Sequence, residues 1–198
     1  MKESVKMILL IGGESHTGKT LMAQRLMERY RYPYTSLDHL KMGLIRGWPG
    51  CGFTAEDSDE KISCSMWGIT QGIIDTCVEN QQNLILEGCY LPPFRVKTLI
   101  CDKVVAAYLG FSERYIREHF SDVLRFENVI EKRLFPEGRS AEDFVKGSLR
   151  VKEECIANGL PYFEINEDYQ KETAQVYGYI DKKIRQAQTA DNENSPAK

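Results

Sequence analysis

The chain has 198 residues, 42% of them hydrophobic, and a formal net charge of −3 at neutral pH. A chain of this length can bury one substantial core, so we expect a single domain. The weak negative charge argues against a broad basic surface and makes nucleic acid an unlikely partner. The apolar run at residues 5–11 is too short for a signal peptide or a membrane span, so we expect no membrane association.

Six cysteines are scattered along the chain, and no two of them have the spacing of a C-x-x-C pair. They are Cys51, Cys64, Cys77, Cys89, Cys101 and Cys155. This pattern is typical of reduced thiols in an intracellular protein. We therefore expect free thiols and a cytoplasmic location.

Residues 12–20 read Gly-Gly-Glu-Ser-His-Thr-Gly-Lys-Thr, which fits the pattern G-x-x-x-x-G-K-[S/T] from Gly13 to Thr20. The apolar run before this stretch predicts a buried parallel strand. Apolar residues at helical spacing follow it, from Leu21 to Met27. A strand, a glycine-rich turn and a helix in this order indicate a phosphate-binding loop. The alternative is an ordinary strand-to-helix turn with a surface lysine.

The residue types explain how such a loop would hold a polyphosphate. Gly13 and Gly18 permit a tight turn that directs backbone N–H groups at phosphate oxygens. Lys19 would place a positive charge on the outer phosphates, and Thr20 would offer a hydroxyl to Mg²⁺. The predicted nucleotide-binding residues are Gly13, Glu14, Ser15, His16, Thr17, Gly18, Lys19 and Thr20.

A second predicted strand, residues 32–37, is followed by Asp38 and by a helix that ends near Gly47. Asp38 has two interpretations: it caps this helix, or its carboxylate faces the nucleotide from the carboxyl edge of the sheet. Residues 48–52 are predicted to form a loop. Residues 55–79 are predicted to be mainly helical, with an apolar stripe that belongs to the core.

A third predicted strand, residues 83–88, ends with Glu87 and Gly88. A carboxylate at a strand end can hold hydrated Mg²⁺, although a purely structural glutamate is the alternative. Pro92, Pro93 and Arg95 then open a short helix, and residues 103–109 form a fourth predicted strand. Strands that alternate with helices in this way indicate an α/β fold.

Residues 112 to about 134 have a helical pattern, with Arg114, Arg117 and Arg125 grouped away from its apolar face. Residues 114–150 hold six of the twelve arginines of the chain. This concentration favours a lid over residues 112–150 that closes on phosphate groups. The alternative is a solvated face on which the arginines pair with Glu113, Glu118, Glu127 and Glu131.

The remaining pattern predicts a helix at residues 141–157, a fifth strand at 162–165 and a final amphipathic helix from Lys171 to Ala187. We therefore expect one domain over residues 1–187. The polar tail, residues 188–198, is expected to be disordered.

With these motifs in place, the chain resembles the P-loop small-molecule and nucleotide kinases, such as shikimate and gluconate kinases, adenylate kinases, 2-phosphoglycerate kinases and zeta toxins. The resemblance covers residues 5 to about 185. It rests on Gly-Glu-Ser-His-Thr-Gly-Lys-Thr, Ser-Leu-Asp, Leu-Ile-Leu-Glu-Gly and the arginine-rich segment. It implies a three-layer fold with a five-stranded parallel sheet in the order 2-3-1-4-5, ATP on the loop with Mg²⁺, and an acceptor over the sheet edge.

Carried over by position, the resemblance implies catalytic roles for Lys19, Asp38 and Arg117. It implies Mg²⁺ ligation by Thr20 and Glu87. It also implies that Asp38, Arg46 and Arg95 bind the acceptor and that Arg114, Arg117 and Arg125 act in the lid. Glu14 and His16 depart from the family pattern, in which small residues are common inside the loop.

The reaction type follows from Asp38 if its carboxylate faces the acceptor. A hydroxyl nucleophile benefits from a base, whereas the phosphate oxygen of a nucleoside monophosphate does not. The chain lacks an N-K-x-D guanine-binding motif, which favours ATP. We therefore expect a phosphotransferase that moves the γ-phosphate of MgATP to a small-molecule hydroxyl. A nucleoside monophosphate kinase and an ATP-binding regulatory or toxin-like module are the alternatives.

Overall fold

Five parallel strands form the centre of the protein. The computed structural model describes residues 5–125, 138 and 140–194. The strands are β1 (Ile8–Gly13), β2 (Tyr34–Ser36), β3 (Leu84–Glu87), β4 (Val104–Phe111) and β5 (Tyr162–Ile165). They lie in the order β2-β3-β1-β4-β5, and every neighbouring pair is parallel. The predicted α/β fold and strand order are confirmed.

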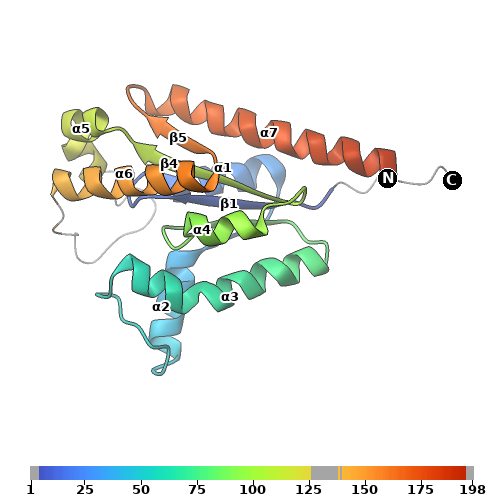
Figure 1. Ribbon diagram of the computed structural model, residues 1–198, viewed down its shortest axis with the longest axis horizontal. Helices are drawn as coiled ribbons and strands as arrows, with labels where there is room; N and C mark the ends of the chain where they lie inside the picture. Colours follow the sequence, from blue (N-terminus) through green and yellow to red (C-terminus); the bar gives the residue numbers. More distant parts are fainter. Residues whose placement is uncertain (1–4, 126–137, 139, 195–198) are drawn as a thin grey trace.

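Helices cover both faces of the sheet and give the fold three layers (Figure 1). They are α1 (Lys19–Tyr30), α2 (Leu37–Gly47), α3 (Asp59–Glu79), α4 (Pro93–Val96), α5 (Glu113–Arg125), α6 (Ala141–Asn158) and α7 (Tyr169–Asn194), with a 3₁₀ turn at Lys97–Leu99. Among the residues described, no helix is both long enough and apolar enough to span a membrane.

The two faces of the sheet contribute side chains to two separate hydrophobic cores, because successive side chains of a strand point to opposite sides. On one face, Leu9 and Ile11 of β1 pack with α1, α5 and α7. On the other face, Ile8 and Leu10 pack with α2, α3 and α4. All four side chains are almost completely buried. The double burial explains the unbroken apolar run in β1 and anchors the loop that follows it to a rigid layer.

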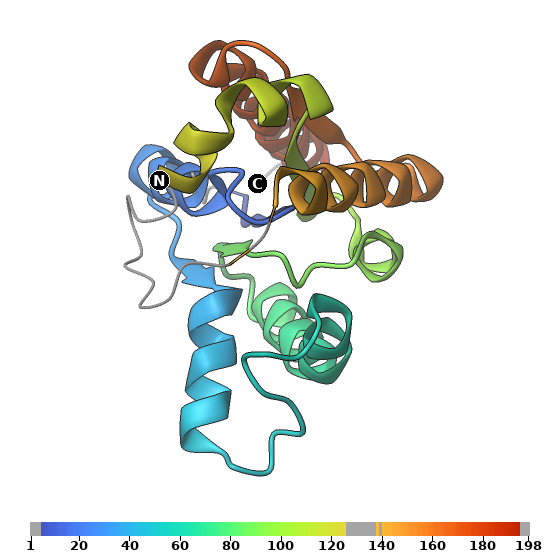
Figure 2. The same cartoon turned by 90° about the vertical axis from the view of Figure 1, so that its left-hand side faces the viewer.

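The carboxyl ends of β1, β2 and β3 meet at one edge of the sheet. Ser36, at the end of β2, lies beside Glu87 in β3, and Glu87 lies beside Ile11 in β1. Figure 2 looks onto this edge, with α2 and α3 on one side of it and α5 and α7 on the other. This edge is therefore where three parts of the chain meet: the loop at residues 13–20, Asp38, and the segment after Glu87. Open α/β sheets bind their ligands at such an edge.

The C-terminal helix is longer than expected. α7 begins at Tyr169 and continues past Ala187 to Asn194, so most of the tail that was expected to be disordered is helical. The chain has no proline or glycine between Gly178 and Pro196 that would end the helix. The domain boundary at residue 187 remains a prediction.

The expected lid is described in part. α5 accounts for the predicted helix as far as Arg125, and α6 begins at Ala141. Residues 126–137 and 139 lie outside the described residues, and with them Glu127 and Glu131, two of the expected partners of the arginines. The closing motion of the segment remains a prediction.

Candidate active site

The loop between β1 and α1 follows a path that only glycine permits at two positions. Gly13 has a φ of +136°, and a Cβ there would collide with the main-chain carbonyl of Leu109. Gly18 has a φ of +80°, and a Cβ there would collide with the Tyr169 hydroxyl. Both φ values lie in a region that L side chains rarely adopt. Strand β4 and helix α7 therefore pack directly against the loop and determine its shape.

Hydrogen bonds inside the loop converge on Glu14. Its carbonyl accepts hydrogen bonds from the Thr17 hydroxyl at 2.8 Å and from the Lys19 ammonium at 2.6 Å. Its side-chain Oε1 accepts one from the backbone N–H of Ser15 at 2.9 Å. The side chain of Glu14 is therefore part of the loop and engages one of the N–H groups that a phosphate would use.

Lys19 is 6% exposed and lies inside the loop rather than on the surface. Burial by itself would lower the pKa of Lys19, but Cys89 and three carboxylates outweigh it, so the pKa lies above its ordinary value. These carboxylates belong to Glu87, Glu14 and Asp38. The ammonium group is therefore charged at neutral pH, as binding to a phosphate requires.

Replacement of the Glu14 carboxylate is expected to strengthen MgATP binding. Glu14→Gln keeps an oxygen that can accept the Ser15 N–H but removes a negative charge that would repel phosphate. We expect the dissociation constant to fall by about tenfold, equivalent to ~1.4 kcal/mol, measured by calorimetric titration. The matched control is Glu79→Gln at the exposed end of α3, which should leave the constant unchanged. Weaker binding would instead mean that the carboxylate is needed to build the loop.

Side-chain oxygens that could ligate Mg²⁺ lie where the loop meets β3. The Thr20 hydroxyl donates a hydrogen bond of 3.3 Å to Oε1 of Glu87, which is 1% exposed. Ser36, beside Glu87 at the end of β2, is 2% exposed, and its Oγ has no hydrogen-bond partner among the described residues. Mg²⁺ prefers oxygen ligands and keeps several of its waters, so one hydroxyl and one carboxylate are enough. The chemistry of Thr20 and Glu87 therefore suits Mg²⁺, and their role as its ligands remains a prediction.

Asp38 lies in the first turn of α2, and the N-cap position belongs to Ser36. Its Oδ1 accepts a hydrogen bond of 2.9 Å from Lys41, and Lys41 also donates one of 2.7 Å to the Tyr90 hydroxyl. The Lys41 ammonium lies 5.0 Å from the centre of the Tyr90 ring. The carboxylate of Asp38 is thus fixed in place, near enough to Lys19 to raise its pKa.

The two arginines expected to bind the acceptor lie on α2 and α4. Arg46 is exposed in the last turn of α2. The guanidinium of Arg95 lies 5.5 Å from the ring centres of Trp67 and Phe94, and its Nη2 contacts the Cys64 sulfur at 3.8 Å. None of these contacts involves the phosphate loop, and the roles of both arginines in binding an acceptor remain predictions.

The arginines of α5 make ion pairs on the surface. Arg114 pairs with Glu118 at 2.9 Å and with Glu167 at 3.3 Å. Arg117 pairs with Glu113 at 3.0 Å and with Glu142 at 2.7 Å, and 47% of its side chain is exposed. Arg125 is exposed at the end of α5. Arg114 and Arg117 therefore lie on a solvated face and pair with glutamates, which is the alternative to the lid interpretation. Their contact with phosphate remains a prediction.

A cavity of about 220 Å³ lies beside the loop, with Gly13 in its wall. The start of α3, the segment after β3 and the second half of α6 form its other walls. These elements lie on one side of the sheet in Figure 2. Because Gly13 at the start of the loop lies in its wall, this cavity is the candidate acceptor site.

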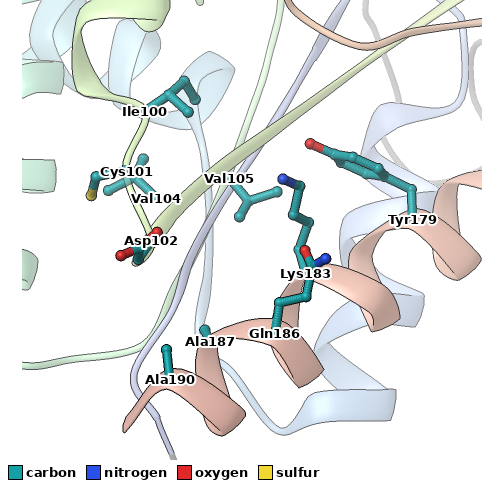
Figure 3. A pocket seen from close by; sticks show the side chains of 10 residues that line it. All are labelled: Ile100, Cys101, Asp102, Val104, Val105, Tyr179, Lys183, Gln186, Ala187 and Ala190. Atoms are coloured by element: carbon teal, nitrogen blue, oxygen red, sulfur yellow. The ribbon is translucent and has the colours of Figure 1, made fainter. Parts of the chain in front are cut away.

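A second hollow, of about 120 Å³, lies away from the loop (Figure 3). It is formed by residues just before and at the start of β4, such as Asp102 and Val104, and by Tyr179 and Lys183 of α7. It is therefore at the amino end of β4, the edge of the sheet opposite the phosphate loop. Its position excludes it as part of the nucleotide site.

All six cysteines are free thiols in the structure. Cys89 lies in the wall of the cavity beside the loop, and its sulfur is 3.4 Å from the Ser15 hydroxyl. Burial raises the pKa of Cys89 to about 11, although the charge of Lys19 opposes the shift. The thiol is therefore protonated at neutral pH and is a weak nucleophile.

Cys89 should accordingly react slowly in native alkylation with iodoacetamide at pH 7.5, as should the buried Cys155, whose pKa burial raises to about 12. The exposed Cys64 and Cys101 serve as internal controls because they lie on the surface. The rate at Cys89 should rise with pH up to about 11, since only the thiolate reacts. Peptide mass spectrometry over a pH series measures each site. Labelling of Cys89 faster than Cys64 at pH 7.5 would contradict this assignment.

The structure adds residues that sequence reasoning missed. Lys41 and Tyr90 hold Asp38, and Tyr169 covers Gly18 with its hydroxyl directed at the Thr17 carbonyl, 3.5 Å away. Lys41 could have been found from its spacing, because residues three apart on a helix share a face. Tyr169 gives no such signal in the sequence, since the contact depends on the docking of the last helix.

No protein-family model matches the chain, and no curated protein matches it. Solved structures do match. A gluconokinase from Sinorhizobium meliloti 1021 superposes with a TM-score of 0.54 at 12% identity, covering 98% of this chain and 100% of that one. A shikimate kinase from Bacteroides thetaiotaomicron gives 0.53 at 13% identity, covering 88% and 98%.

A candidate kinase from Chloroflexus aurantiacus gives a TM-score of 0.58 at 17% identity, covering 90% of this chain and 98% of that one. Identities this low show a common fold and leave the acceptor open. Together with the strand order and the geometry of the loop, they show that the chain has the fold of the P-loop kinases, including shikimate kinase and gluconokinase.

Proposed function

We propose that the protein is a kinase that transfers the γ-phosphate of MgATP to a hydroxyl group of a small molecule. The observation that carries the proposal is the convergence of Lys19, the Thr20–Glu87 pair and Asp38 at one edge of the sheet. A protein that only binds ATP needs the loop and the metal ligands. It has no need for a second carboxylate held beside the lysine.

Each group has a physical role in this reaction. Bound Mg²⁺ would neutralise charge on the phosphates. Lys19 and the backbone N–H groups of the loop would hold the phosphate oxygens, and Thr20 and Glu87 would orient the metal. Asp38 would accept the proton of the acceptor hydroxyl as its oxygen bonds to the γ-phosphorus and ADP leaves. Lys41, bonded to Oδ1 of Asp38, would keep that carboxylate in position.

A screen of acceptors tests the proposal directly. The full-length protein is mixed with MgATP and either hydroxyl-bearing metabolites or nucleoside monophosphates, and ADP release is followed, with ³¹P NMR to identify the product. We expect turnover with a hydroxyl acceptor and none after Mg²⁺ is chelated. Turnover with monophosphates alone would identify a nucleoside monophosphate kinase. MgATP binding without turnover of either class would favour a regulatory module.

A further inference from the structure

The cavity beside the phosphate loop has the chemistry of a binding site for a cation. Its lining contains three carboxylates, Asp59, Glu60 and Glu154, and one guanidinium, that of Arg150. A second guanidinium, that of Arg95, contacts Cys64 and Phe94 of the same lining, so the carboxylates still outnumber the cations. An acceptor that carries a carboxylate or a phosphate would be repelled by this net negative charge, whereas an ammonium group would be attracted. The lining also includes Pro92 and Phe94, which offer apolar surface.

Two of the three carboxylates are also favoured by a helix dipole, and the third is not. Asp59 and Glu60 stand in the first turn of α3, where the helix dipole favours negative charge. Glu154 stands one residue before the last turn of α6, where the helix dipole gives a negative charge no such support. Its carboxylate therefore adds negative charge to the cavity wall without support from the helix dipole.

Ser63 is an independent observation that points to a ligand. It lines the cavity and is 7% exposed, and its Oγ has no hydrogen-bond partner among the described residues. A buried hydroxyl without a partner is destabilising, so such groups are usually satisfied by a ligand or by bound water. Ser63 therefore supplies a polar contact within the cavity, one turn along α3 from Asp59 and Glu60.

We propose, on the basis of the kinase function above, that the acceptor is a small molecule with both a hydroxyl group and a cationic amino group, of the amino-sugar or aminocyclitol class. Its ammonium faces the carboxylates, Ser63 binds a polar substituent, and the hydroxyl to be phosphorylated points toward Gly13 and the loop. The new bond joins the hydroxyl oxygen to the γ-phosphorus, the bond to ADP breaks, and the proton passes to Asp38. The cavity volume of about 220 Å³ suits a compact metabolite.

Matched acceptors that differ mainly in charge test this inference. Binding of glucosamine, glucose and gluconate to the full-length protein with MgADP is measured by ligand-observed NMR, and turnover with MgATP by ADP release. We expect both affinity and turnover to be highest for glucosamine, lower for glucose and lowest for gluconate. A preference for gluconate would overturn the inference while leaving the kinase proposal intact. Failure to bind MgATP would refute the kinase proposal itself.

Variants of one helix locate the effect in the cavity. Glu154→Gln should raise the KM for the amino acceptor at least tenfold, whereas Arg150→Gln should lower it, because the two charges act with opposite sign on an ammonium group. Glu153→Gln, exposed on the same helix and outside the cavity wall, is the matched control and should change nothing. Bound amino acceptor should also slow alkylation of Cys64, which lines the cavity, relative to Cys101. Equal KM values for Glu154→Gln and the native protein would contradict the assignment.

Discussion

Asp38→Asn is expected to lower the turnover number with a hydroxyl acceptor by about 10²- to 10⁴-fold, which is the usual contribution of a general base. Asparagine has the same size and can still accept the 2.9 Å hydrogen bond from Lys41. It cannot take a proton from the acceptor. The dissociation constant for MgATP should not rise, since a negative charge near Lys19 is removed, and the thermal midpoint should stay unchanged. Steady-state kinetics measures the turnover number, calorimetric titration measures the dissociation constant, and a thermal melt measures the midpoint.

The position of Asp38 makes the result easy to interpret. Ser36 holds the N-cap position of α2, so a loss of turnover cannot be attributed to a lost helix cap. Asp75→Asn, at an exposed position of α3, is the matched control. Unchanged turnover in Asp38→Asn would rule out the base. Tighter binding of a phosphate-bearing acceptor would point to a nucleoside monophosphate kinase, since a repulsive charge would have been removed.

Lys19→Met is expected to raise the dissociation constant for MgATP by roughly 10- to 150-fold, which corresponds to the loss of a charge-assisted contact on the order of 1.5–3 kcal/mol. Methionine retains much of the buried volume of Lys19 but removes the ammonium. It also leaves the carboxylates around Lys19 without their cation, which adds repulsion against the phosphates. Calorimetric titration gives the constant, and a thermal melt shows whether the variant is folded.

The matched control for Lys19 is Lys97→Met, at an exposed position in the 3₁₀ turn after α4. It should bind MgATP as the native protein does. If Lys19→Met is folded and also binds MgATP with native affinity, the loop is not a nucleotide site and the proposed function falls with it.

The local parts of this site could be predicted from the sequence because they depend on short spacings. Gly13, Gly18, Lys19 and Thr20 form the loop within one βα turn, and the unbroken apolar character of β1 signals burial on both faces. Glu87 could be predicted because the end of a parallel strand lies at the same edge as the loop. In each case the path of the backbone is enough to place the side chain at the site.

Residues whose environment depends on packing between distant segments could not be predicted. The contact of Arg117 with Glu142 joins α5 to α6, and that of Arg114 with Glu167 joins α5 to the segment after β5. A long side chain on an exposed helix has many partners within reach, and the sequence does not say which of them the fold brings near. The same holds for Glu154, which shares a cavity wall with Asp59 only because α6 passes the start of α3.

The contact between Tyr169 and the phosphate loop joins the start of the last helix, α7, to the loop that precedes the first helix, α1. Tyr169 lies on α7, yet its hydroxyl occupies the space that a side chain at position 18 would fill and is directed at the Thr17 carbonyl. Burial raises the pKa of Tyr169 to about 12, so this hydroxyl keeps its proton. During synthesis, a nascent chain that has passed α1 but not yet produced α7 lacks this contact. We expect the loop to reach its final form only after the last helix has docked, so that ATP, if it binds the formed loop, stabilises the completed chain and not a shorter nascent one.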